Sequence, residues 1–333
     1  MSSTVNLYPD LVHEGDLTPD FEDEIEVICN DIHAACEGWG TDESSLLTAM
    51  GSTTAEDRYK IVIKFEEIYE KPLIDLIRSE TSGDFGMVLK LLALSPAEAE
   101  ARLIDKATKD WGTAEGHLYP LVCGRSNADM DALKKTFYKM FEKDLVSLVD
   151  SEVDGDLEKL LVVCLQGIEE EFDPDYHTEE KVEEDTEVFY DAGQGTFFGT
   201  DEKGMFNILT LSPPEHLANI NAAYADKYGY TLFKAFELEL GGIAEKAALF
   251  TLGMKLKPYE TVAKLIKSAC AGWGTDESLL AACIVRYQNI LPDVQLAHVE
   301  LFEKTIHERI RDECGGKFED VLLEIINKVC PEE

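Results

Sequence analysis

Apolar residues along this 333-residue chain recur at the three- and four-residue spacing that is typical of α-helices. Near the start, Ile25, Ile28 and Ile32 share one helical face, and Gly38 ends that helix. The same region predicts four more helices, over residues 45–50, 55–69, 73–79 and 85–94. No run of alternating β-branched residues bounded by turn residues predicts a strand. The pattern therefore predicts an all-α protein whose first unit contains five short helices.

One short motif occurs four times and defines the organisation of the chain. It reads Gly-Trp-Gly-Thr-Asp-Glu at 38–43 and at 272–277, with weaker copies at 109–115 and 197–202. Each copy is followed, 39 or 40 residues after its second Gly position, by an acid that stands before a glycine turn. These four acids are Glu80, Glu152, Glu239 and Glu313. A fixed pair of features that occurs four times indicates four structural repeats.

The repeat boundaries follow from this spacing. We predict an N-terminal tail over 1–20 and four repeats of five helices over 21–95, 96–167, 186–256 and 257–333. Between the second and third repeats lies an acidic, proline-interrupted connector, 168–185, which we expect to split the array into two pairs of repeats.

Charge and cysteine usage limit the classes of function. The chain has 67 acidic and 30 basic residues, a formal charge of −37, so we expect no nucleic acid partner. An acidic protein that meets an acidic surface needs a cation between them. The eight Cys are scattered singly, which favours reduced thiols in the cytosol. We see no secretory signal and no apolar run of the roughly 18 to 20 residues that a membrane span needs.

The repeated loop and its distant acid suit a calcium ion. Ca²⁺ prefers about six to eight hard oxygen ligands, often main-chain carbonyls together with a carboxylate. A Gly-x-Gly loop turns several carbonyls towards one point, because Gly tolerates positive φ. We predict two such ligand sets: the carbonyls of Cys36, Gly38 and Gly40 with Glu80, and the carbonyls of Cys270, Gly272 and Gly274 with Glu313.

A purely structural interpretation of the loop has to be weighed against this one. Gly, Thr and Asp are also the residues that a helix C-cap followed by an N-cap prefers, and Thr41 is the predicted N-cap of the next helix. For a single copy the structural interpretation is the better one. It does not explain the distant acid in four repeats.

Aromatic residues stand at the tips of the same loops. All three Trp of the chain, Trp39, Trp111 and Trp273, occupy the position between or before the glycines, and Phe197 and Phe198 take that place in the third loop. A loop tip is a poor place to bury an indole, whereas the amphipathic ring suits the membrane interface. We therefore predict that these aromatics contact a membrane.

Other motifs give weaker evidence for a functional site. Residues 150–155 resemble the start of an EF-hand loop, but position twelve is Leu161 instead of Glu. The seven His do not cluster at zinc or catalytic-triad spacing. We therefore expect no enzymatic activity.

On these residues the chain resembles the annexins over nearly its full length. Gly38-Trp39-Gly40-Thr41 with Glu80 and Gly272-Trp273-Gly274-Thr275 with Glu313 carry the family's pattern, and the Trp of the first loop is similar to the plant and protist branches. The resemblance implies a curved disc of four five-helix repeats with calcium loops on its convex face. In the second repeat it implies carbonyls of Thr108, Asp110 and Gly112 with Glu152. In the third it implies Phe197 and Gly199 with Glu239, and either Gly195 or Thr196 as the third carbonyl.

The expected function is calcium-dependent, reversible binding to anionic phospholipid membranes. The protein would be cytoplasmic and would associate peripherally with membranes when calcium rises. The alternative is a structural or scaffold protein that joins the cytoskeleton or other proteins, with calcium binding secondary. The acidic connector and the overall charge motivate that alternative.

Overall fold

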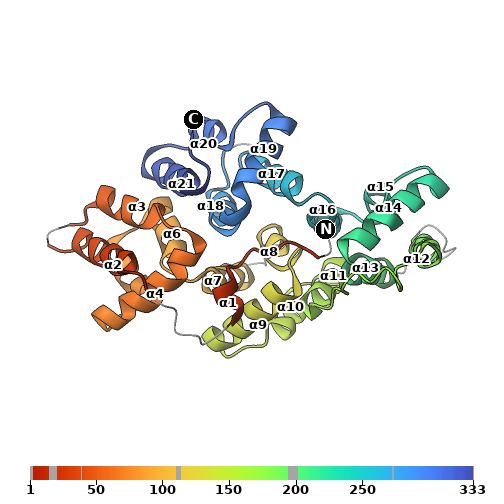
Figure 1. The fold of residues 1–333 in the computed structure, drawn as a ribbon, viewed down its shortest axis with the longest axis horizontal. Helices are drawn as coiled ribbons and strands as arrows, with labels where there is room; N and C mark the ends of the chain where they lie inside the picture. Colours follow the sequence, from red (N-terminus) through yellow and green to blue (C-terminus); the bar gives the residue numbers. More distant parts are fainter. Residues whose placement is uncertain are drawn as a thin grey trace. The chain divides into compact units, whose positions relative to one another are not determined.

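The structure is a computed structural model that describes residues 3–14, 21–38, 40–109, 114–193, 202–271 and 274–332. Within these ranges the chain forms 21 α-helices, one 3-10 helix and no strand (Figure 1). The all-α fold predicted from the spacing of apolar residues is confirmed. No helix in the described ranges has the length and apolar character needed to cross a bilayer.

After a short helix α1 (Asp10–Glu14), the helices follow one another in four sets of five. The first set is α2 (Asp23–Ala35), α3 (Glu43–Gly51), α4 (Ala55–Tyr69), α5 (Leu73–Glu80) and α6 (Gly83–Leu92). The second is α7 (Pro96–Lys109), α8 (Glu115–Val122), α9 (Asn127–Phe141), α10 (Leu145–Glu152) and α11 (Gly155–Gln166). The third is α12 (Glu179–Ala192), α13 (Glu202–Leu211), α14 (Pro214–Tyr228), α15 (Leu232–Glu239) and α16 (Gly242–Leu256). The fourth is α17 (Pro258–Ala269), α18 (Glu277–Arg286), α19 (Leu291–Phe302), α20 (Ile306–Glu313) and α21 (Gly316–Val329), with the 3-10 helix η1 (Gln288–Ile290) between α18 and α19.

The turn between the fourth and fifth helices has the same backbone in every repeat. The fourth helix always ends on the acid found in the sequence, and two residues in extended conformation follow it. The fifth helix then starts on a glycine with φ between 61° and 72°, namely Gly83, Gly155, Gly242 or Gly316. Residues with a Cβ rarely adopt this φ, which explains why the acid is followed by a glycine turn.

The chain divides into two compact units that differ from the pairs predicted in chain order. One unit holds Leu7–Ala101 and Val262–Glu333, and so combines the first and fourth repeats. The other holds Arg102–Thr261, the second and third repeats, with the N-terminal residues up to Asn6. The expectation that the connector separates two pairs of repeats was wrong, because the connector lies inside one unit.

In the unit of the first and fourth repeats, helices α3, α6, α18 and α21 pack around a shared core. Their inward side chains, such as Leu46, Leu89 and Leu322, are fully buried. A buried polar network joins the two repeats: the Arg58 guanidinium donates to Gln288 Oε1 over 2.7 Å, and Gln288 Nε2 donates to the Thr53 carbonyl over 2.8 Å. These bonds satisfy polar groups that would otherwise destabilise the core.

In the unit of the second and third repeats, α11 packs against α13 and α16. Lys255 of α16 is buried and forms an ion pair of 2.9 Å with Glu169. Its ammonium also donates to the carbonyls of Thr210 and Ser212, over 2.8 and 2.7 Å. These contacts anchor the start of the connector to the third repeat.

Two terminal and connecting segments differ from their predictions. Residues 179–185 of the predicted connector belong to helix α12, whose N-cap is Thr178, so the irregular segment ends there. The predicted tail contains α1, and Leu7 and Tyr8 before it are buried. The Tyr8 hydroxyl donates to Glu100 Oε2 over 3.0 Å, which explains why this polar ring is tolerated inside.

Candidate metal-binding loops

The loop of the first repeat leaves α2 at Cys36 and is closed by a hydrogen bond from the Asp42 N–H to the Ala35 carbonyl, 2.8 Å long. Gly38 and Gly40 have φ of 102° and 89°. Both are exposed, and a Cβ built on either would meet no atom within 4 Å. The glycines are therefore needed for the backbone conformation and not to avoid a clash.

The distant acid meets this loop directly. The Thr41 hydroxyl donates to Glu80 Oε2 over 2.7 Å and also lies 3.3 Å from the Glu80 carbonyl oxygen. The structure thus brings together the two features that the sequence separates by about 40 residues. A half-buried carboxylate is therefore held beside the glycine loop.

The role predicted for Thr41 as a helix N-cap was wrong. Asp42 caps α3 instead, and its carboxylate accepts from the N–H groups of Ser44 and Ser45 over 3.2 and 3.1 Å. These hydrogen bonds, above all those from Ser45, lower the pKa of Asp42. Asp satisfies the two free donors at the helix start, which leaves the Thr41 side chain free to reach the acid.

The cysteine at the start of the loop is not a thiolate. Burial, and secondly the charge of Glu80, raise the pKa of Cys36 to about 11. In the fourth repeat burial and the charge of Glu313 raise the pKa of Cys270 to about 11, against an opposing effect of Arg309. Neutral thiols are poor ligands for a hard cation, so at these positions only the carbonyl oxygens suit calcium.

The fourth repeat has the same construction. The Asp276 N–H closes the loop on the Ala269 carbonyl over 2.7 Å, and Gly274 has a φ of 104°. The Thr275 hydroxyl donates to the main-chain carbonyl of Glu313 over 3.1 Å. Loop and acid are therefore adjacent here too, while Gly272 lies outside the described residues.

In the second and third repeats the structure describes only part of each site. The Ala114 N–H closes the second loop on the Ala107 carbonyl over 2.9 Å, the same seven-residue step as in the first and fourth repeats. In the third repeat, a Cβ built on Gly193 would lie 3.4 Å from Glu239 Cγ, so the acid again lies beside the start of the loop. Glu152 is the last residue of α10 and is exposed.

Several predicted residues lie outside the described part of the chain. In the second loop these are Asp110, Trp111 and Gly112, and in the third Gly195, Thr196, Phe197, Phe198 and Gly199. Trp39 and Trp273 are outside it as well. The membrane contacts assigned to the aromatics remain predictions.

The ligands present fit calcium better than a transition metal. Among the described residues, no group of three or more His, Cys, Asp or Glu side chains is placed to hold a metal ion. In the first repeat the Glu80 carboxylate lies beside the glycine loop, and in the fourth the main-chain carbonyl of Glu313 does. Oxygen atoms of both kinds suit calcium. Sequence reasoning missed the threonine that ties the first and fourth loops to their acids, although the Thr after Gly-x-Gly at positions 41 and 275 was its signal.

Comparison with known proteins agrees with this construction. The profile of the family named Annexin matches residues 29–92, 99–164, 185–250 and 261–325, one match for each repeat. The chain belongs to the annexin family. Annexins generally bind phospholipids in a calcium-dependent manner and are generally not enzymes.

Annexins from distant organisms align over most of the chain. Mouse annexin A13 is 31% identical over 89% of this chain and 93% of its own length. Annexin A13 of Schistosoma japonicum is also 31% identical, over 89% of each chain. Among solved structures, annexin III superimposes with a TM-score of 0.85 at 25% identity over 98% of both chains. A calcium-bound annexin (Sm)1 has the same fold, with a TM-score of 0.77 at 21% identity over 91% of this chain and 90% of its own.

Proposed function

We propose that this annexin binds anionic phospholipid membranes reversibly when calcium rises, through the loops of its first and fourth repeats. The observation that carries the proposal is the contact of Thr41 with Glu80, and of Thr275 with Glu313. Each contact places an acid from another helix beside a glycine loop. A structural cap would need only the loop and not the distant acid.

The ligands we assign are main-chain carbonyls and one acid in each repeat. They are Cys36, Gly38, Gly40 and Glu80 in the first repeat, and Cys270, Gly272, Gly274 and Glu313 in the fourth. For the other two repeats we assign Gly112 with Glu152, and Phe197 and Gly199 with Glu239. A bound calcium ion supplies positive charge that can also accept oxygens of a lipid phosphate. The chain's own residues position that charge at the protein surface.

The net charge of the chain makes the cation necessary. A protein with a formal charge of −37 is repelled by an anionic leaflet, and this repulsion acts within about 10 Å at ordinary salt. Cations held at the loops reverse the sign of the local potential. The aromatic tips, Trp39, Trp111, Phe197, Phe198 and Trp273, would then enter the interface, where amphipathic rings are favoured. The protein would be cytoplasmic at low calcium and peripheral on membranes at high calcium.

The proposal is tested by co-sedimentation of the full chain with phosphatidylserine vesicles across a calcium titration. Binding should appear with calcium, reverse on addition of a chelator, and be weak on phosphatidylcholine vesicles. Binding that persists in chelator, or none at millimolar calcium, would reject the proposal. In that case the scaffold alternative, with cytoskeletal or other protein partners, becomes the better account.

A further inference from the structure

Two cysteines of the second repeat lie in contact although 41 positions separate them in the sequence. The Cys164 thiol donates a weak hydrogen bond to the sulfur of Cys123, and the two Sγ atoms are 3.8 Å apart. Both are reduced in this structure. The sulfurs of a disulfide are about 2.0 Å apart, so an approach of about 2 Å would allow a bond between them.

Both cysteines stand at helix ends. Cys123 follows α8 and has extended backbone angles, with φ of −79° and ψ of 160°. Cys164 lies in the last turn of α11, which ends at Gln166. The two helices pack against each other inside the unit of the second and third repeats. Because helix ends fray more readily than helix centres, we expect the sulfurs to approach each other without loss of either helix.

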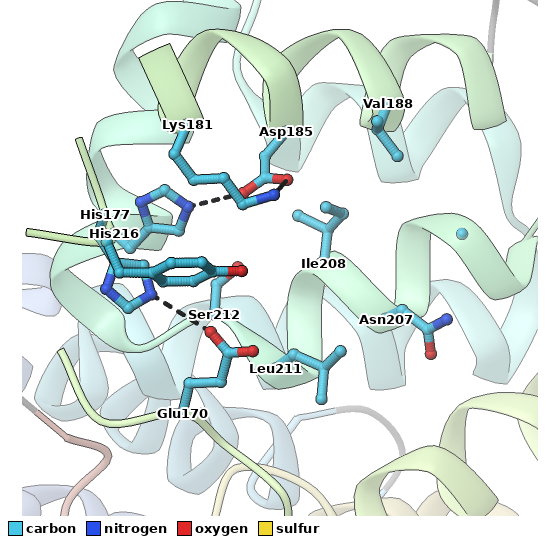
Figure 2. Close-up of a pocket in the computed structure, with 12 residues that line it drawn as sticks. Glu170, His177, Lys181, Asp185, Val188, Asn207, Ile208, Leu211, Ser212 and His216 are labelled. Carbon is cyan, nitrogen blue, oxygen red and sulfur yellow. Dashed lines mark hydrogen bonds and ion pairs between the residues drawn. The ribbon is translucent and has the colours of Figure 1, made fainter. Parts of the chain in front are cut away.

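Cavities in this unit differ in whether a small molecule inside them would meet a thiol. A cavity of about 250 Å³ is formed by the end of the connector, by α12 and α13, and by His216, and no cysteine lines it (Figure 2). A smaller cavity of about 30 Å³ is lined by Cys164, Lys255 and Arg125. A water molecule needs roughly 10–15 Å³ measured in this way, so a molecule as small as hydrogen peroxide fits beside Cys164.

The two thiols differ in access and should react slowly. Cys123 is fully buried, whereas Cys164 is partly exposed, so an oxidant meets Cys164 first. The hydrogen bond to Cys123, and then burial, raise the pKa of the Cys164 thiol well above its usual value, against smaller effects of Lys255 and Thr251. The thiolate is the nucleophile, so the reaction should be slow at neutral pH and faster as the pH rises.

We propose that Cys123 and Cys164 are a modification site, at which hydrogen peroxide forms an intramolecular disulfide that a dithiol reductant reverses. The Cys164 thiolate attacks one peroxide oxygen, the O–O bond breaks, and the sulfur becomes a sulfenic acid with release of hydroxide, which takes up the thiol proton to give water. The Cys123 sulfur then attacks the sulfenic sulfur, the S–O bond breaks, and a second water leaves. Two thiols and one peroxide thus give one disulfide and two waters, and the two electrons lost by the sulfurs reduce the peroxide.

The disulfide would stabilise the second repeat. It closes a loop that contains α9 and α10 and joins α8 to α11. A cross-link of this kind restricts the unfolded chain more than the folded one, so the linked protein should resist urea better than the reduced protein. Exposure to peroxide would therefore make this repeat more stable.

The test treats the full chain with millimolar hydrogen peroxide in the presence of a chelator, so that calcium plays no part. The remaining thiols are alkylated in urea, the protein is digested, and linked peptides are identified by mass spectrometry. We expect a peptide pair joined through Cys123 and Cys164 that disappears after treatment with dithiothreitol. The rate of its formation should rise about tenfold for each pH unit near neutral pH, as the thiolate fraction does.

Matched variants assign the change in stability to this pair. Cys164→Ser should abolish the linked peptide and the increase in urea midpoint that follows peroxide treatment. Cys330→Ser, the same change at another partly exposed cysteine, should leave both unchanged. Urea unfolding of each reduced variant checks that it is folded, and the linked peptide of the unaltered protein is measured without any variant.

The proposal is overturned if Cys123 and Cys164 stay reduced under conditions that oxidise Cys330, which would show that they are only small packed side chains. It is also overturned if Cys164 is converted to a sulfinic acid without a link to Cys123, or if the linked protein unfolds at lower urea than the reduced protein. A rate of linkage that does not change with pH contradicts the slow, thiolate-dependent step. None of these outcomes bears on the calcium-dependent function.

Discussion

The backbone of the first loop makes a quantitative prediction for Gly40→Ala. Gly40 has a φ of 89°, and a Cβ there would meet no atom within 4 Å, so the substitution adds backbone strain and no clash. Holding a residue with a Cβ at positive φ costs about 1–2 kcal/mol, a factor of about 5 to 30 in an equilibrium constant. The loop is tied at its ends by the bond from Asp42 to Ala35. The strain must therefore reduce either the stability of the calcium-free fold or the affinity of the loop for calcium.

Two measurements separate these contributions. Urea unfolding without calcium gives the loss of stability, and the calcium midpoint of vesicle binding gives the loss of affinity. The second is measured in a Glu313→Gln background, which removes the acid of the fourth repeat. The two losses should add up to about 1–2 kcal/mol.

The control is Gly116→Ala in α8, where the added Cβ also meets open space but φ is not positive. It should leave the calcium midpoint unchanged and leave stability unchanged or raise it by up to about 1 kcal/mol. If Gly40→Ala changes neither the stability nor the calcium midpoint, the claim that positive φ at this position strains a residue with a Cβ is refuted.

Three further predictions concern stability and reactivity. Glu303, the residue that follows α19, has a φ of 55°. Glu303→Gly should therefore raise the free energy of unfolding by about 0.5–1 kcal/mol in urea titrations, and a loss of stability would contradict this. Burial raises the pKa of Cys29 and of Cys283 to about 12. Iodoacetamide near neutral pH should therefore label both thiols only after the protein unfolds. Detection of either labelled residue in the native protein by mass spectrometry would contradict this. Burial lowers the pKa of His298 and His307 below the ordinary value of 6.5, so on acidification the unfolded chain binds protons at these residues before the folded chain does. The contribution of these residues to stability should therefore be constant above pH 6.5 and fall below it. Denaturant midpoints that do not fall on acidification would contradict this.

The helices and the pairing of loop with acid could be predicted from sequence because both rest on local rules. The helical spacing of apolar residues, and the glycines with positive φ in the loops and at the start of each fifth helix, can be read directly from the sequence. Ala55–Tyr69 was predicted with the bounds that α4 has in the structure. Glu80 was paired with its loop through the repeated separation, and the Thr41 contact supports that pairing.

Features that depend on tertiary packing could not be predicted in this way. Thr and Asp are both good N-caps, and the choice of Asp42 over Thr41 depends on Glu80 being close enough to bind the threonine. The long connector suggested a boundary, but which repeats share a core is decided by surfaces far apart in sequence, such as those of α3 and α21.

The central claim is that the acids beside the loops, and not acidic charge in general, make membrane binding depend on calcium. The most direct test compares two double variants with the same change in charge by co-sedimentation with phosphatidylserine vesicles. Glu80→Gln with Glu313→Gln removes the two acids, whereas Glu24→Gln with Glu300→Gln changes two exposed acids elsewhere. The account predicts that the first pair loses most calcium-dependent binding while remaining folded, and that the second binds like the unaltered protein. Equal binding by both double variants would contradict the claim.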